Sequence, residues 1–227
     1  MRFSKLSSRA NTLGATPRPA GILTNRITRK ALLAMAALAA LANARSSMAA
    51  GVAWTAGTTL SGDSDVFNAG VPTYAYDLNN SAQSVNGVSF TGSNSQTALG
   101  TDVTLSGFDG GNYPGFGTGS APFNNLSSAY KAVLTGGDYA NGGTPVTFSL
   151  NNLSANHIYS VQYWADDSRS GFLGRYETLT STGGNSQLIT YTNTASAGGL
   201  GQYSLGYFTA GGATQALTAR GETRISV

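Results

Sequence analysis

Short runs in which apolar and polar residues alternate dominate the chain from residue 51 onward. Neighbouring residues of a β-strand face opposite sides of a sheet, so each run predicts a half-buried strand. The apolar positions of the runs are Val88 and Phe90; Val103 and Leu105; Val146, Phe148 and Leu150; Tyr159, Val161, Tyr163 and Ala165; Tyr203, Leu205 and Tyr207; and Leu217 and Ala219. Turn residues such as Asn86-Gly87 separate them. The pattern predicts an all-β fold, a jelly-roll-like antiparallel β-sandwich.

Residues 126–134 break this alternation and predict one short helix. Their apolar side chains recur at helical spacing, at Leu126, Tyr130, Val133 and Leu134. Asn125 or Ser127 can cap the start of the helix, and Gly136 suits the left-handed position that often follows a helix. We expect this helix to close one end of the sandwich.

A glycine-rich segment, residues 107–121, lies before the helix. It carries Phe108, Tyr113 and Phe116 and is too long and irregular for a hairpin turn. We expect a surface loop that aromatic side chains anchor to the domain.

The first 49 residues have the features of a secretory signal peptide. Arg29-Lys30 precedes the apolar run Ala31–Ala44, and Ser47-Met48-Ala49 follows as a small-residue cleavage pattern, with Ala42-Asn43-Ala44 as a second candidate. The run is shorter than the roughly 20 residues of a membrane span. We therefore expect residues 1–49 to be removed, and residues 50–227 to form a single exported domain with no membrane span.

Charge separates the same two segments. Of the 13 basic residues, eight lie in the first 49 positions, whereas all ten acidic residues lie after them. The body is therefore acidic, which argues against nucleic acid as a partner. The chain has no cysteine, which excludes disulfides and thiolate metal sites.

One stretch carries a family resemblance. Residues 150–169 read LNNLSANHIYSVQYWADDSR, and residues 63–66, 85–90 and 201–209 fit the same kind of protein. These motifs resemble exported bacterial β-sandwich proteins of the PEP-CTERM and autotransporter-associated β-repeat type. The resemblance extends, more distantly, to the galactose-binding-like jelly rolls of carbohydrate-binding modules. It implies a secreted or cell-surface protein of mainly structural character.

Catalytic signatures are weak in this sequence. His157 is the only histidine, and no G-x-S-x-G motif is present. Asp166, Asp167 and Glu177 are the nearest carboxylates for glycoside hydrolysis, but their spacing is unspecific. We expect a non-catalytic protein without a cofactor.

A structural calcium ion is the one cofactor left open. Asp63 and Asp65, and likewise Asp166 and Asp167, place carboxylate oxygens at strand ends, and calcium prefers such ligands. The alternative interpretation is an aspartate-stabilised turn without a metal ion.

The candidate ligand-binding residues lie on and after the run 159–165. If Tyr159, Val161 and Tyr163 face the core, then Trp164 and Gln162 face the other way. An outward-facing Trp164 would offer an aromatic surface for a sugar ring, with Gln162, Asp166 and Arg169 binding hydroxyl groups. Alternatively, Trp164 packs beneath a loop or the short helix.

Three functional hypotheses result. The first is an exported, non-catalytic β-sandwich with a structural or adhesive role at the cell surface. The second is a carbohydrate-binding module of the galactose-binding-like type, with glycans as partners. The third is a glycan-processing enzyme.

Overall fold

The computed structural model describes residues 2–7, 51–78, 81–141 and 143–223. The predicted signal-peptide run Ala31–Ala44 and both cleavage candidates lie outside these residues. Residues 2–7 of the same predicted leader form a strand, β1, within the domain. Among the described residues, no helix has both the length and the apolar character needed to cross a bilayer.

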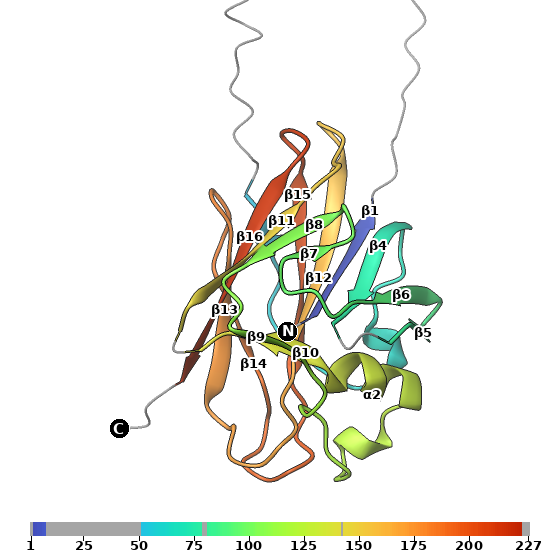
Figure 1. Cartoon of the computed structure of the whole chain (residues 1–227), viewed down its shortest axis with the longest axis vertical. Helices are drawn as coiled ribbons and strands as arrows, with labels where there is room; N and C mark the ends of the chain where they lie inside the picture. The colour runs from blue at the N-terminus through green and yellow to red at the C-terminus, as the bar shows by residue number, and fades with distance from the viewer. Residues whose placement is uncertain (1, 8–50, 79–80, 142, 224–227) are drawn as a thin grey trace, which may run out of the picture. The chain divides into compact units, whose positions relative to one another are not determined.

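The domain is an all-β sandwich of two largely antiparallel sheets (Figure 1). The larger sheet has the strand order β2-β15-β12-β1-β4-β6-β5, and β3 also pairs with β15. Its strands are β1 (Arg2–Ser7), β2 (Ala53–Trp54), β3 (Thr58–Thr59), β4 (Val71–Asp77), β5 (Gln83–Val85), β6 (Val88–Gly92), β12 (Ile158–Ala165) and β15 (Gln202–Thr209). All pairs in this sheet are antiparallel except β4 with β6.

The smaller sheet has the order β14-β13-β16-β11-β8-β7 and is antiparallel throughout. Its strands are β7 (Ala98–Leu99), β8 (Val103–Ser106), β11 (Pro145–Leu150), β13 (Arg175–Thr180), β14 (Gln187–Thr190) and β16 (Gln215–Thr223). A separate ribbon pairs β9 (Gly110–Tyr113) with β10 (Gly137–Tyr139).

The main hydrophobic core lies between the sheets and follows the predicted alternation. The positions in this core that the pattern predicted correctly are Val103, Leu105, Val146, Phe148, Leu150, Tyr159, Val161, Tyr163, Ala165, Leu217 and Ala219. Val88 and Phe90 are also buried, as predicted, but in a different cluster. Phe148 meets Tyr163 edge to face across the two sheets, with their ring centroids 5.7 Å apart. The predicted antiparallel sandwich is thus confirmed.

The predicted core face of β15 is wrong. Ser204, Gly206 and Phe208 face the interior, whereas Tyr203, Leu205 and Tyr207 lie on the other face. The reason is steric, because a Cβ atom on Gly206 would stand 2.5 Å from Val52 Cγ1 and 2.8 Å from a ring carbon of Trp54. The side chains of Val52 and Trp54 therefore fill the core at this point, next to Gly206, which has no side chain.

The short helix α2 (Ser128–Thr135) and the 3-10 turns η1 (Asp63–Asp65) and η2 (Phe123–Asn125) complete the fold. The helix buries Tyr130, Val133 and Leu134, as predicted. It forms a second hydrophobic cluster with β5, β6 and Trp164 of β12, so it covers the outer face of the larger sheet.

One end of α2 has the cap that the sequence predicted, and the other end does not. Ser127 is the N-cap, and its hydroxyl accepts a hydrogen bond from the Tyr130 backbone N–H. Gly136 does not take the predicted left-handed conformation, because its φ of −94° and ψ of 158° are extended. The chain leaves the helix directly into β10, which an extended residue permits.

Ser127 generates a stability prediction. Its hydroxyl accepts from Tyr130 N at 3.1 Å and donates to Asp63 Oδ1 at 2.6 Å, so it joins the helix to η1. Ser127→Ala should lower the free energy of unfolding by about 1 kcal/mol, the usual effect of losing an N-cap. Urea titration measures it. Ser128→Ala, one residue into the same helix, is the control, and an equal loss in both variants would contradict the capping role.

Candidate functional site

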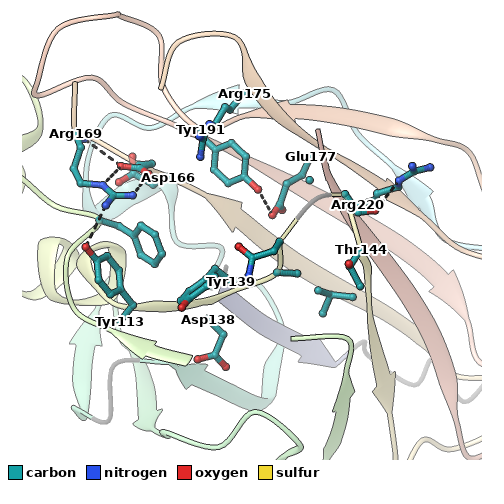
Figure 2. A pocket seen from close by; sticks show the side chains of 17 residues that line it. Tyr113, Asp138, Tyr139, Thr144, Asp166, Arg169, Arg175, Glu177, Tyr191 and Arg220 are labelled. Atoms are coloured by element: carbon teal, nitrogen blue, oxygen red, sulfur yellow. Dashed lines mark hydrogen bonds and ion pairs between the residues drawn. The ribbon is translucent and has the colours of Figure 1, made fainter. Parts of the chain in front are cut away.

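A cavity of about 720 Å³ opens at one end of the inward face of the smaller sheet (Figure 2). Strands β11, β13 and β16 form its floor, and the β9–β10 ribbon and the segment after β12 form its walls. The lining residues are Tyr113, Phe116, Asp138, Tyr139, Ala140, Asn141, Gly143, Thr144, Val146, Asp166, Asp167, Arg169, Arg175, Glu177, Tyr191, Arg220 and Gly221. The cavity is thus rich in aromatic, acidic and guanidinium groups.

Arg169 organises one wall of this cavity. Its Nε and Nη2 atoms donate to the two carboxylate oxygens of Asp167 at 2.8 and 2.6 Å, a two-pronged ion pair. Its Nη1 donates to the Tyr113 hydroxyl at 3.2 Å. The guanidinium also lies over the rings of Phe116 and Phe172, at 5.3 and 4.4 Å from their centroids. The hydrogen bond to Asp167 raises the pKa of Arg169 above its ordinary value.

Backbone contacts fix the segment that carries the two aspartates. The Asp167 N–H donates to the Tyr191 carbonyl at 2.8 Å, and the Ser168 N–H donates to the Phe116 carbonyl at 2.8 Å. Asp166 Oδ1 accepts from the Gly201 N–H at 2.9 Å. Two connections, the one between β14 and β15 and the one after β9, therefore hold the segment 166–168 at the end of β12.

Glu177 is a buried carboxyl group beneath the cavity. The Tyr163 hydroxyl donates to its Oε2 at 2.6 Å, and the Tyr191 hydroxyl donates to its Oε1 at 2.5 Å. Burial raises the pKa of Glu177 above its ordinary 4.5, although the two tyrosine hydrogen bonds act in the opposite direction. Burial also raises the pKa of both tyrosines well above 10, so both remain proton donors.

The β9–β10 ribbon presents aromatic side chains at the cavity. Tyr113 is 39% exposed and Tyr139 is 42% exposed, and their ring centroids lie 6.3 Å apart. Phe116 packs edge to face on Tyr113 at 5.0 Å. The predicted loop 107–121 therefore includes a short strand, and its aromatic residues form part of a concave site.

The structure brings only two of the expected ligand-binding residues to this cavity, Asp166 and Arg169. Gln162 is buried, and its amide holds η1 in place. Its Oε1 accepts from the Phe67 N–H at 2.9 Å, and its Nε2 donates to the Asp65 carbonyl at 2.7 Å. Gln162 is thus a structural residue of the second cluster.

The outward position considered for Trp164 is wrong. Trp164 is only 1% exposed and contacts Phe90 edge to face, with ring centroids 6.1 Å apart. The helix and the β5–β6 hairpin cover the face of β12 that the alternation assigned to the outside. The other alternative, burial under the short helix, is the observed one.

Asp63 and Asp65, the candidate calcium ligands, both accept hydrogen bonds from within the chain. Asp65 accepts from the Ser61 N–H and hydroxyl and from the Gly62 N–H, all within 2.9 Å. Asp63 accepts from the Ser127 hydroxyl. Within the described part of the chain, no three His, Cys, Asp or Glu residues group together as a metal site would require. The bonding pattern is that of an aspartate-stabilised turn.

Several lining residues were not singled out from the sequence, among them Asp138, Tyr139, Tyr191 and Arg220. They come from different strands and loops, so no local motif joins them. The one local signal was the aromatic content of residues 107–121. The remaining residues become neighbours only when β10, β13 and β16 meet.

Comparison with known proteins gives no relative. No family model, no curated protein and no solved structure matches the chain. The geometry of the cavity is therefore the main evidence on function.

The burial of Trp164 predicts a large stability effect. Trp164→Ala should lower the free energy of unfolding by about 3–5 kcal/mol, the usual cost of deleting a buried large aromatic side chain. Ile158→Ala is the control on the same strand, because Ile158 is 56% exposed, and it should change that free energy by less than about 0.5 kcal/mol. Equal losses in urea titrations of the two variants would refute this burial.

Glu177 predicts a pH dependence of stability. Its pKa is higher in the folded chain than in the unfolded chain, so the folded state retains a proton that the unfolded state releases. The free energy of unfolding should therefore fall as the pH rises from about 4.5 to the pKa of the folded chain. Glu177→Gln should reduce that fall in urea titrations at a series of pH values. An unchanged pH profile would show that Glu177 does not cause it.

Proposed function

We propose that this protein is an exported, non-catalytic β-sandwich that binds a saccharide unit of a glycan in the cavity beside β10 and β13. The observation that carries the proposal is the lining itself. Exposed tyrosine rings line the cavity together with carboxylates and guanidinium groups. Binding sites for small molecules combine such apolar surfaces with a few convergent polar groups.

The balance of charge supports a neutral polyhydroxylated ligand. Three arginines and four acidic residues line the cavity, so positive and negative groups nearly balance. Arg169 is already paired with Asp167. A phosphate or carboxylate ligand would meet nearby acids, whereas sugar hydroxyl groups can both donate to carboxylates and accept from guanidinium groups.

A binding role is better supported than glycoside hydrolysis by Glu177 and Asp167. A hydrolase needs one carboxyl group as a proton donor and another as a nucleophile or base. In this cavity, Tyr163 and Tyr191 occupy both oxygens of Glu177, and Arg169 occupies both oxygens of Asp167. These groups are held in place by the protein, which suits a rigid binding surface.

Export is supported by the sequence alone. The basic segment, the apolar run 31–44 and the small residues that follow it are typical of a secretory signal peptide. The resemblance of residues 150–169 to exported bacterial β-sandwich proteins points to the same location, outside the cytoplasm.

A structural or adhesive surface role is the second candidate. It is favoured by large apolar side chains on the surface, at Ile158, Leu173, Leu188 and Tyr207. Such residues can contact another macromolecule without any small ligand. This candidate predicts association that is independent of the cavity.

A glycan array, followed by calorimetric titration of each sugar that binds, tests the proposal. Tyr139→Ala should weaken binding at least about tenfold, which equals about 1.4 kcal/mol, because it removes an exposed ring at the cavity. Tyr207→Ala is the matched control, since Tyr207 is 38% exposed, lies on β15 and does not line the cavity. It should leave the affinity unchanged.

Two results would contradict the proposal. One is an array with no bound glycan, and the other is equal loss of affinity in Tyr139→Ala and Tyr207→Ala. Hydrolysis of a bound oligosaccharide would favour the enzyme hypothesis instead.

A further inference from the structure

The position between β12 and β4 in the larger sheet is filled by β1, the first described strand of the chain (Figure 1). β1 pairs antiparallel with β12 over six residues, from Arg2 with Trp164 to Ser7 with Tyr159. On its other edge it pairs antiparallel with β4, from Phe3 with Tyr76 to Ser7 with Val71. β1 is therefore an internal strand of the sheet, with a hydrogen-bonded neighbour on each side.

The spacing of β12 and β4 leaves room for one strand between them and prevents the two from pairing with each other. Because β1 is antiparallel to both, β12 and β4 run parallel to each other and lie two strand spacings apart. Neighbouring strands are about 4.8 Å apart, so the two strands cannot pair directly across roughly twice that distance. Closing the gap would require one half of the sheet to move against the core.

Burial makes an empty position costly. Val161, Gln162, Tyr163 and Trp164 of β12 are each at most 1% exposed, so the strand is covered on both faces. Without β1, the backbone N–H and C=O groups along these edges of β12 and β4 would lose their hydrogen-bond partners, and unpaired groups between two covered faces are unfavourable. An extended segment that supplies the missing hydrogen bonds would satisfy them.

The segment that supplies them is separated from the rest of the domain in sequence. Residues 8–50 lie between β1 and the next described residue, yet β1 belongs to the same compact unit as residues 51–223. No short loop in the sequence joins β1 to a neighbouring strand. Its pairing along both edges therefore accounts for its place in the sheet.

We propose that the position between β12 and β4 is a strand-acceptor site, and that residues 2–7 of this chain occupy it as a non-covalently held strand. It follows that the strand remains bound after the chain is cut between β1 and residue 51. This inference does not depend on saccharide binding. It implies that proteolytic removal of residues 1–49 and loss of β1 from the sheet are separate events.

The test cuts the folded full chain. A recognition sequence for a site-specific protease is inserted after Ala49, the protein is cut, and the products are separated by gel filtration. The N-terminal fragment should co-elute with the body of the protein, and denaturant should release it. Separation of the fragment under native conditions would overturn the proposal.

Disulfide trapping then locates the fragment, because the chain has no cysteine of its own. Leu6→Cys is combined with Ser160→Cys, since these two residues are register partners, and the co-eluting complex is oxidised after the cut. Mass spectrometry should find a disulfide that joins the fragment to β12. The control is Ser4→Cys with Ser160→Cys, which is two residues out of register and should form at least tenfold less disulfide. Equal yields, or none from the registered pair, would overturn the proposed site.

Discussion

The burial of β12 on both faces is the constraint on which the rest of the structure depends. Its inward residues, such as Val161 and Tyr163, build the core between the sheets, and its outward residues, Gln162 and Trp164, build the layer beneath α2. The same strand carries Tyr163 to the Glu177 carboxyl and leads directly into the aspartates of the cavity. A displacement of β12 would therefore disturb the core, the helix layer and the candidate site together.

Period-two alternation predicted six strands, including β11, β12 and β16, but it missed β4 and β13 and did not indicate the number of layers around the strands. It placed Val161 and Tyr163 correctly, because one face of β12 is in the core whatever covers the other. Trp164 remained ambiguous, since alternation reports only that it faces away from Tyr163. On β15, alternation predicted the wrong core face. The inward residue Gly206 has no side chain, and Trp54, about 150 positions earlier in the sequence, occupies the volume beside it. Only the folded structure shows that a side chain distant in sequence fills the space next to a glycine.

The candidate site was harder to predict than the fold for the same reason. Asp166 and Arg169 were recognised because they follow a clear strand within one local motif. Tyr139 and Arg220 were not recognised, because they reach the cavity from β10 and β16, whose positions depend on pairings between distant segments. A ligand site at the end of a sandwich collects side chains from several loops, so its composition is a property of topology and not of a contiguous motif.

The buried Glu177 carboxyl connects the stability of the domain to the character of the cavity. A charged group beneath the floor would attract cations and repel the carboxylates of Asp138 and Asp166, which line the same space. Burial raises the pKa of Glu177, and the hydroxyl groups of Tyr163 and Tyr191 orient the carboxyl group by donating to its two oxygens. Three arginines and four acidic residues nearly balance in charge around the cavity, so a ligand would be selected by hydrogen-bond geometry and ring contact. Long-range electrostatic attraction would contribute little, so affinity should depend only weakly on ionic strength.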